Sequence, residues 1–360
     1  MIDTRLPMPA DPAPIVLMGA GGIVRDAHLP AYRKAGFPVH AICNIDREPA
    51  AQLADEYGIE HVFTDVAEAV DAAPARCVFD VAIMPPQFAA TLGQLPVGAH
   101  VLLQKPMGDD PAMTAAIADV CRARRQHVAV NCQLRYAPFV RAARELIDAG
   151  RIGTLHHMTV HVDVDTPWHR FPNVVHLPRL EIQQHSIHYV DLLRSFLGDP
   201  TRVFCRTVGH PIHPELAPTR STLMLDFGPD VQATIVTNHA HAFGPRHQQS
   251  YIKWEGTRGA IKATMGLLQD YPVGVADVFE YCVLDDDHEP RWVSAELEGS
   301  WFPDAFIGTM ADVQRHLEGT LDQMPTRFED TLRTMACVDA AYEDDRHGGT
   351  RPTYPDTTHA

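Results

Sequence analysis

The sequence has no unbroken apolar segment long enough to cross a membrane and no cysteine pair spaced as C-x-x-C. Its seven cysteines are scattered and odd in number, which argues against a disulfide framework and a cysteine-based zinc site. Basic residues are also scarce, because 30 Lys and Arg stand against 46 Asp and Glu, for a formal net charge of −16. A chain this acidic repels polyanions, so we expect neither nucleic acid nor an anionic membrane surface as a partner.

Length and hydrophobic content indicate two domains. At 360 residues with 45% hydrophobic residues, the chain is longer than a single hydrophobic core usually supports. Its first residues combine acidic side chains and prolines, whereas a secretory signal begins with a basic segment followed by an apolar one. We therefore expect a cytoplasmic protein whose cysteines are buried free thiols.

Short apolar runs alternate with helix-like stretches in the first third of the chain. This alternation predicts a parallel sheet covered by helices, which binds ligands at the carboxyl ends of its strands. The predicted strands are 14–19, 38–43, 77–84 and 100–104, and the predicted helices are 22–35, 49–57, 87–95 and 110–125.

Three glycines follow the first predicted strand in the segment GAGGIV. Gly19, Gly21 and Gly22 allow a tight turn, and backbone N–H groups from there to Ile23 can approach a pyrophosphate at a helix N-terminus. The strict fingerprint has Gly or Ala where Val24 stands. The strand–turn–helix context nevertheless predicts a dinucleotide site.

The end of the second predicted strand bears on the choice of cofactor. Asn44 occupies the first position where NAD-binding folds place a ribose-binding carboxylate, and Asp46 and Arg47 follow it. Asp46 would repel a 2′-phosphate and Arg47 would attract one. We expect NAD, with NADP as the less favoured alternative.

Several motifs follow one another along the chain: VLMGAGGIVRDAHLPAYRK, DVAIMPP, GAHVLLQKPM and HSIHYVDLLRSFLGDP. In this order they resemble the glucose–fructose oxidoreductase/inositol dehydrogenase (Gfo/Idh/MocA) family. The resemblance implies an α/β protein with an N-terminal Rossmann parallel sheet in residues 1–131. An α+β domain with a large, mostly antiparallel sheet would follow in residues 132–360. One face of that sheet would cover the active site, and the other would form the interface of a homodimer or homotetramer.

The resemblance also implies a reaction. Family members transfer a hydride between nicotinamide and an anomeric carbon or secondary alcohol, so we expect an NAD(P)-dependent dehydrogenase of a small sugar or cyclic polyol. Family position adds Pro85, Gln104 and Lys105 to the expected cofactor contacts and places Arg135 near the site. Two usual carboxylates are amides here, Gln104 and Gln184, and a histidine that commonly follows the P-P of the fourth strand is missing.

The chemistry of hydride transfer points to two side chains. The alcohol needs a base for its proton and a group that stabilises the developing alkoxide. Lys105 ends an apolar strand, and Pro106 disfavours a helical backbone before it, so we expect its ammonium to be held in one direction. Apolar spacing predicts a helix over 181–197 with Gln184 and His188 on one polar stripe. We hypothesise that Lys105 shares or takes the base role and that His188 binds or protonates the substrate oxygen, which leaves the identity of the base open.

Neighbouring groups would tune this pair. Glu181 and Asp191 lie on the same predicted stripe and are candidates for fixing the tautomer of His188. The amide of Gln104 leaves Lys105 without a carboxylate that would hold it protonated. We therefore expect desolvation to lower the pKa of Lys105 toward neutrality.

Substrate contacts are expected from the second domain. Aromatic faces pack on sugar C–H groups, while imidazoles and cations bind hydroxyl or carboxylate oxygens. Beside Lys105 and His188, the candidates are Arg135, Trp168, His169, Arg179 and His185, with Asn238, His239 and Trp301 as further candidates from later segments.

The sequence allows three alternatives to this interpretation. The spacing of HSIH, with His161, Asp163, Asp165 and His169 nearby, would suit a metal, but alternation over 156–165 explains those side chains as the polar face of a strand, so we expect no metal. A second enzymatic alternative keeps NAD bound and uses transient oxidation for elimination, isomerisation or glycoside cleavage. The third is a catalytically degenerate NAD-binding sensor or regulator.

Overall fold

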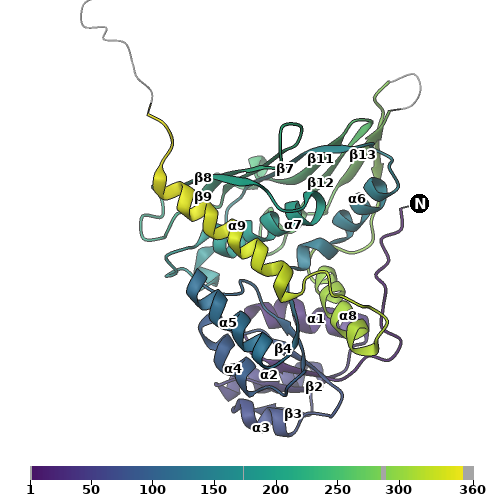
Figure 1. The fold of residues 1–360 in the computed structure, drawn as a ribbon, viewed down its shortest axis with the longest axis vertical. Helices are drawn as coiled ribbons and strands as arrows, with labels where there is room; N and C mark the ends of the chain where they lie inside the picture. Colours follow the sequence, from purple (N-terminus) through teal and green to yellow (C-terminus); the bar gives the residue numbers. More distant parts are fainter. Residues whose placement is uncertain (1, 173, 285–288, 352–360) are drawn as a thin grey trace, which may run out of the picture.

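The chain forms two sheets with helices between and around them (Figure 1). The computed structural model describes residues 2–172, 174–284 and 289–351. Residues 1 and 352–360, at the outer ends of the two predicted domains, lie outside the described residues. None of the described helices is both long and apolar enough to span a bilayer.

The smaller sheet has six parallel strands in the order β3-β2-β1-β4-β5-β6, which confirms the predicted Rossmann sheet. The edge strands β3 and β6, which are only three and four residues long, were not predicted. The strands are β1 (Ile15–Met18), β2 (Val39–Cys43), β3 (His61–Phe63), β4 (Val78–Val81), β5 (His100–Leu103) and β6 (His127–Val130).

Side-chain caps explain where several helices of this domain begin. The carboxylates of Asp46, Asp65 and Asp110 each accept a hydrogen bond from a backbone N–H of the first turn that follows. The predicted helix 22–35 instead opens with a π-helical turn, η1, before α1. The helical elements are η1 (Val24–His28), α1 (Leu29–Ala35), α2 (Arg47–Tyr57), α3 (Val66–Asp71), α4 (Phe88–Gln94) and α5 (Pro111–Ala123).

The larger sheet has eight strands in the order β14-β13-β12-β11-β7-β10-β9-β8. Every neighbouring pair is antiparallel except β7 and β10, so the sheet is mostly antiparallel, as predicted. The strands are β7 (Leu155–Asp163), β8 (Arg202–Val208), β9 (Arg220–Asp226), β10 (Gln232–Asn238), β11 (Gln249–Gly256), β12 (Gly259–Thr264), β13 (Phe279–Val283) and β14 (Trp292–Ala295). Helices α6 (Pro138–Asp148) and α7 (Ile187–Leu197) lie on the side of this sheet that faces the Rossmann domain (Figure 1).

After the larger sheet, the chain returns to the Rossmann domain. Helix α8 (Asp304–Glu318) lies beside α1 (Figure 1), and its Phe306 and Met310 share a core with Tyr32 and Leu102. Helix α9 (Phe328–His347) packs on α5 and α7. Residues late in the chain therefore complete the first domain, and the division at 131/132 stays a prediction.

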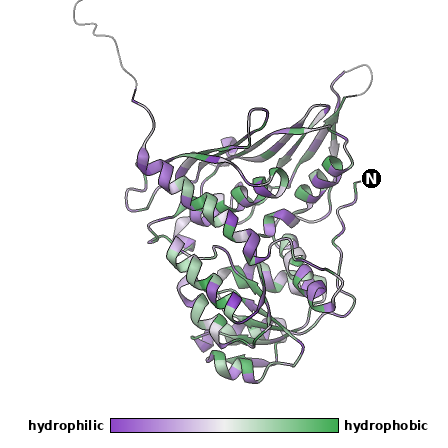
Figure 2. Cartoon of the chain, viewed as in Figure 1, coloured by the Kyte–Doolittle hydropathy of each residue, from purple (hydrophilic) through white to green (hydrophobic). Residues whose placement is uncertain are grey.

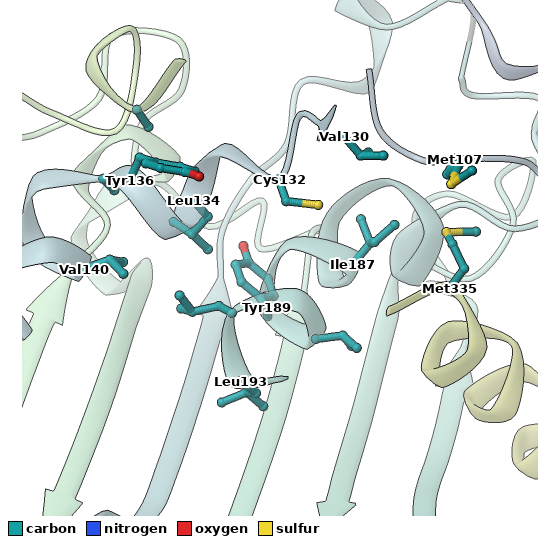
Figure 3. Packing of buried hydrophobic residues seen from close by; sticks show 14 of the residues in the cluster. Met107, Val130, Cys132, Leu134, Tyr136, Val140, Ile187, Tyr189, Leu193 and Met335 are labelled. Carbon is teal, nitrogen blue, oxygen red and sulfur yellow. The ribbon is translucent and has the colours of Figure 1, made fainter. Parts of the chain in front are cut away.

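A hydrophobic core joins the two sheets. In Figure 2 the strands of the smaller sheet are mainly hydrophobic, whereas the helices carry residues of both kinds. One cluster of buried residues extends from β1 and β4 through the domain junction to the second sheet. Figure 3 shows its central part, with Met107, Val130, Cys132, Leu134, Tyr136, Val140, Ile187, Tyr189, Leu193 and Met335 labelled. This shared core fixes α7 relative to the strand ends of the Rossmann sheet.

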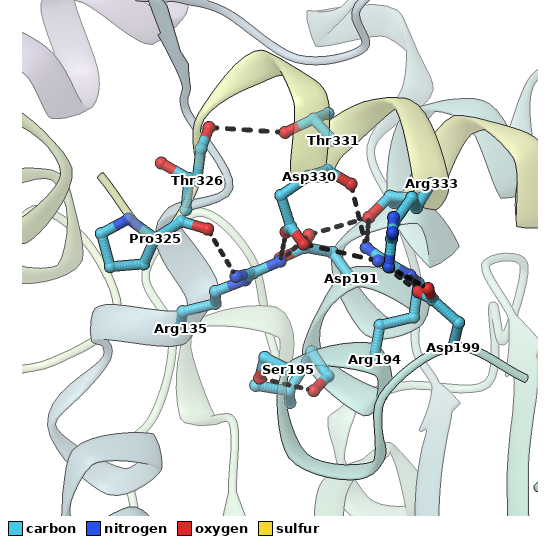
Figure 4. Close-up of polar contacts among 12 residues, drawn as sticks. Arg135, Asp191, Arg194, Ser195, Asp199, Pro325, Thr326, Asp330, Thr331 and Arg333 are labelled. Atoms are coloured by element: carbon cyan, nitrogen blue, oxygen red, sulfur yellow. Dashed lines mark hydrogen bonds and ion pairs between the residues drawn. The ribbon is translucent and has the colours of Figure 1, made fainter. Parts of the chain in front are cut away.

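A network of ion pairs reinforces the junction (Figure 4). The guanidinium of Arg135, in the 3₁₀ turn η3 (Gln133–Tyr136), donates to both carboxylate oxygens of Asp191 at 2.6 Å each. It also donates to Asp330 at 2.7 Å and to the carbonyl of Pro325 at 3.1 Å. Asp191 is 1% exposed. The network therefore joins η3, α7 and α9.

We expect Asp191→Asn to lower the free energy of unfolding by about 2 kcal/mol, because the largely buried Arg135 loses its two-pronged carboxylate partner and keeps only Asp330 as a charged partner. Denaturant unfolding measures this change. Arg333→Gln is the matched control, since Arg333 pairs with Asp199 in the same network but is exposed, and its loss should cost less than about 1 kcal/mol. Equal losses in the two variants would contradict a structural role for Asp191.

Candidate active site

The glycine turn after β1 is packed against the ends of two neighbouring strands. Gly19 has φ +115°, and a Cβ there would lie 2.3 Å from the carbonyl oxygen of Ala82, just after β4. Its N–H donates to the carbonyl of Cys43 at the end of β2, at 2.7 Å. Gly21, in contrast, has no atom within 4 Å of the position of a Cβ. The fold thus requires glycine at Gly19 but leaves open space beside Gly21.

The end of β2 is tied to this turn. The Asn44 side chain accepts from the N–H of Ala20 at 3.2 Å and donates to the carbonyl of Asp46 at 2.7 Å. Asp46 caps α2, and Arg47 donates to the carbonyl of Val62 at 3.2 Å. Asp46 and Arg47 are both exposed at the carboxyl edge of the sheet.

The residues that follow β4 and β5 complete the carboxyl edge of the sheet. Pro85 is buried in the 3₁₀ turn η2 (Pro85–Gln87), which follows β4. Gln104 and Lys105 follow β5, and the peptide bond between Lys105 and Pro106 is cis. The predicted cofactor residues therefore come from the carboxyl ends of β1, β2, β4 and β5, where ligands of such sheets bind.

Gln104 contacts a buried histidine. Its amide oxygen accepts from the N–H of Lys105 at 2.7 Å, and its Nε2 lies 3.1 Å from Nε2 of His28. Nδ1 of His28 lies 2.7 Å from the Asp80 carboxylate and is therefore the protonated nitrogen. Its Nε2 accepts from the amides of Gln104 and Asn131, the latter at 3.3 Å. A carboxylate in place of Gln104 would face a lone pair, so an amide suits this position.

Lys105 reaches across the domain junction. Its ammonium donates to the backbone carbonyl of Gln184 at 3.0 Å. Burial lowers the pKa of Lys105 to about 8, the direction expected from the sequence. Gln184 thus contributes its backbone oxygen to the contact with Lys105.

His188, which is on α7, lies close to Lys105. Its side chain is buried at 9% exposure and meets the Trp301 ring edge-on at 5.8 Å. Burial, reinforced by the charge of Lys105, holds the pKa of His188 well below its ordinary value. His188 is therefore a neutral imidazole at neutral pH.

The two carboxylates considered as partners of His188 have other partners. The segment before α7 is a π-helical turn, η5 (Ile182–Ser186), so Glu181 lies over the residue five positions on and accepts from Ser186 at 2.7 Å. Glu181 also accepts from Ser221, and Asp191 pairs with Arg135. The expectation that one of them orients His188 is therefore wrong: the π turn displaces Glu181, and Arg135 binds Asp191 although the α-helix keeps its regular spacing there.

A second group of rings borders the same region. His185 stacks on His239 with centroids 4.2 Å apart, and Trp168 meets both rings edge-on. Burial lowers the pKa of His185 well below its ordinary value, and the neighbouring His239, Lys105 and His188 add to the effect. Nδ1 of His185 is buried and has no hydrogen-bond partner among the described residues.

Other candidate residues have partners of their own or are exposed. Arg135 is held in the ion network, and Arg179 pairs with Asp339 at 2.7 Å while its guanidinium lies over the Tyr342 ring. His169 is exposed. Asn238 donates to Asp163 at 2.8 Å. Within the described ranges, the histidines and aspartates near HSIH do not converge as three metal ligands.

Three features of the site were missed by sequence reasoning: the Gln184 carbonyl, the contact of Trp301 with His188, and the His28–Asp80 pair. One signal was available, because Asp80 interrupts an apolar strand and a buried carboxylate needs a partner. A backbone carbonyl leaves no such mark in the sequence.

Comparison with known proteins decides the family. Residues 14–132 match the model of the oxidoreductase family with an NAD-binding Rossmann fold, and residues 140–262 match that of the GFO/IDH/MocA C-terminal domain. The chain belongs to the GFO/IDH/MocA oxidoreductase family. It is an NAD(P)-dependent enzyme with the predicted two-part fold.

Individual relatives are distant but span nearly the whole chain. D-apiose dehydrogenase of Paraburkholderia graminis is 25% identical over 93% of this chain and 88% of its own. D-xylose 1-dehydrogenase (NADP(+)) 2 of Haloferax volcanii is 22% identical over 91% and 95%. The crystal structure of an Agrobacterium radiobacter oxidoreductase, in complex with NAD+, L-tartaric acid and magnesium, has a TM-score of 0.78 at 20% identity and covers 94% of this chain and 98% of its own.

The glycine turn gives a direct test of the cofactor site. We expect Gly21→Ala to keep the thermal stability of the parent but to weaken NAD binding by about tenfold or more, because only a ligand would meet the new methyl group. Gly19→Ala should instead lower the free energy of unfolding by about 2 kcal/mol through backbone strain. Fluorescence titration with NAD and thermal unfolding measure the two effects. Unchanged NAD affinity in Gly21→Ala would remove this residue from the cofactor site.

Proposed function

We propose that this protein is a dehydrogenase that transfers a hydride from a small sugar or cyclic polyol, at the anomeric carbon or a secondary alcohol, to a nicotinamide cofactor. The observation that carries the proposal is the approach of Lys105 and His188 from two domains at the carboxyl edge of the Rossmann sheet. The relatives named D-apiose and D-xylose dehydrogenases support a sugar substrate.

Lys105 is the proposed base. With a pKa of about 8, about a tenth of its side chain is the neutral amine at pH 7, far more than for an exposed lysine. The Gln184 carbonyl holds the Nζ atom in place, so its lone pair can accept the hydroxyl proton of the substrate. The Lys105 ammonium that results stays hydrogen-bonded to the same carbonyl.

His188 is the proposed ligand of the substrate oxygen. Protonating it would place a second positive charge beside Lys105 in a buried site, so the imidazole stays neutral. A neutral ring donates through one nitrogen and accepts through the other. His188 therefore orients the hydroxyl group while Lys105 removes its proton, and the edge contact with Trp301 restricts its ring.

The cofactor residues fit a dinucleotide. The open space at Gly21 suits close approach of a pyrophosphate to the backbone of Gly21, Gly22 and Ile23. We propose that Asn44 and Asp46 face the adenosine ribose, which favours NAD over NADP, and that Pro85 and Gln104 border the nicotinamide half. When bound, the nicotinamide ring supplies the hydride acceptor.

Trp168, His185 and His188 are the proposed substrate contacts. Trp168 offers an apolar ring to sugar C–H groups, and the unpartnered Nδ1 of His185 offers a polar atom to a hydroxyl. Arg135 and Arg179 are paired with carboxylates, so we assign them to structure instead.

We also propose a cytoplasmic homodimer or homotetramer. Five large apolar side chains of the second sheet are between 39% and 49% exposed, namely Phe204, Val208, Met224, Trp292 and Val293. Phe204 and Met224 are cross-strand partners in the register of β8 and β9, so they lie on the same face of the sheet. Burying such a face against a second copy would remove this apolar surface from water.

A substrate screen tests the function. Purified protein would be incubated with aldoses, sugar acids or cyclic polyols and either NAD or NADP, and the absorbance of the reduced cofactor followed. We expect net reduction of NAD with a small sugar or polyol. Product formation without net NADH would indicate transient oxidation, and cofactor binding without turnover of any substrate would indicate a sensor.

The base assignment predicts a pH dependence. Because the neutral amine is the active form, kcat/KM for oxidation should rise with pH through about 8 and level off above it. Lys105→Met should bind NAD but lose about two orders of magnitude in kcat/KM. Its remaining kcat/KM should no longer rise with pH through about 8. Lys262→Met, which removes an exposed lysine on β12, is the control and should keep the profile. If kcat/KM of Lys105→Met still rose with pH through about 8, the base would be another group.

A further inference from the structure

Three histidines gather at the edge of the Rossmann sheet opposite the cofactor site. His100 and His127 are the first residues of β5 and β6 and are paired in the register of the two strands. His316 lies in the last turn of α8. The cluster thus joins two strands of the Rossmann sheet to a helix that follows nearly 200 residues later.

The rings place their nitrogens together. One nitrogen of each histidine lies within 4.8 Å of the corresponding nitrogen of the other two. Nε2 of His100 and Nδ1 of His316 are 2.9 Å apart, and the rings of His100 and His127 stack with centroids 4.6 Å apart. In the part of the chain that the structure describes, no other set of three His, Cys, Asp or Glu side chains meets the same criterion.

We propose that His100, His127 and His316 bind a zinc ion through three imidazole nitrogens, with water in the fourth position. Zinc–nitrogen bonds of about 2.0–2.1 Å in a tetrahedral site place two ligand atoms about 3.4 Å apart. The His100–His316 pair would open by about 0.5 Å to reach this separation. His127 is exposed, so its ring is free to swing inward.

The ligand chemistry favours zinc over hard cations. Neutral imidazole suits zinc and other late first-row metals, whereas Mg²⁺ and Ca²⁺ take oxygen ligands. A hydrogen bond would by itself account for the His100–His316 pair, but it does not account for the nitrogen of His127 beside it.

The position of the cluster indicates a structural role. Zinc would fasten the end of α8 to β5 and β6. The same helix carries Thr309, which donates to Asn131 at 2.8 Å, and Asn131 in turn contacts His28. The ion would therefore steady the helix that supports the buried network beneath Gln104, at a site independent of the proposed dehydrogenase chemistry.

Zinc titration of the chelator-stripped full-length protein tests the proposal. We expect zinc chloride to bind the parent by calorimetry and to raise its Tm. His127→Gln and His316→Gln should each bind one zinc equivalent fewer, or bind it more than about tenfold more weakly, and lose the rise in Tm. His247→Gln, which removes an exposed histidine elsewhere, should behave as the parent.

The two ligand variants separate folding from binding. His127 is exposed, so His127→Gln should keep the metal-free Tm of the parent and remains informative if His316→Gln unfolds. Tetrahedral absorption bands on substitution with cobalt, present in the parent and lost in His127→Gln, would support three-histidine ligation. Equal zinc binding and equal Tm gain in the parent and His127→Gln would overturn the proposal, as would no zinc binding by the parent.

Discussion

The candidate site depends on the desolvation of one lysine between two domains. Lys105 leaves the Rossmann sheet at the end of β5 and finds its hydrogen-bond partner in a backbone carbonyl just before α7. A carbonyl holds the side chain in place without adding a negative charge. Burial therefore acts on the ammonium without compensation from a carboxylate and brings its pKa down to about 8. This arrangement exists only while both domains keep their relative position, which the shared hydrophobic core secures.

A network of buried polar side chains supports the carboxyl ends of the strands. His28 receives amide hydrogens on one nitrogen and donates from the other to Asp80, which Tyr32 also contacts at 2.7 Å. His28 thus contacts side chains from β4 (Asp80), from just after β5 (Gln104) and from just after β6 (Asn131), which links these three strands. The amide of Gln104 completes the network and in turn accepts from the backbone of Lys105. The amide that departs from the family pattern thus has a definite local function in this protein.

Much of the fold could be predicted from short-range patterns. Four buried strands and the glycine turn each leave a local mark, and the larger sheet followed from the family resemblance. Side-chain partners could not be predicted in the same way. Asp191 pairs with Arg135, 56 positions away, and Arg179 with Asp339, 160 positions away. The spacing rule for an α-helix also failed where the backbone widens into a π turn, because Glu181 then meets Ser186 instead of the residues three or four positions on.

The distribution of carboxylates connects these observations. The chain carries 46 acidic residues, yet the two acidic side chains nearest to His188 in sequence are turned to other partners, Glu181 to two serines and Asp191 to Arg135. Either carboxylate beside Lys105 would stabilise its ammonium form and raise its pKa. The charges that lower the pKa of the neighbouring imidazoles come instead from Lys105 and other histidines. In this acidic protein, the two carboxylates nearest to His188 in sequence are thus held by other partners, Glu181 by serines and Asp191 by the ion network, while burial lowers the pKa of Lys105.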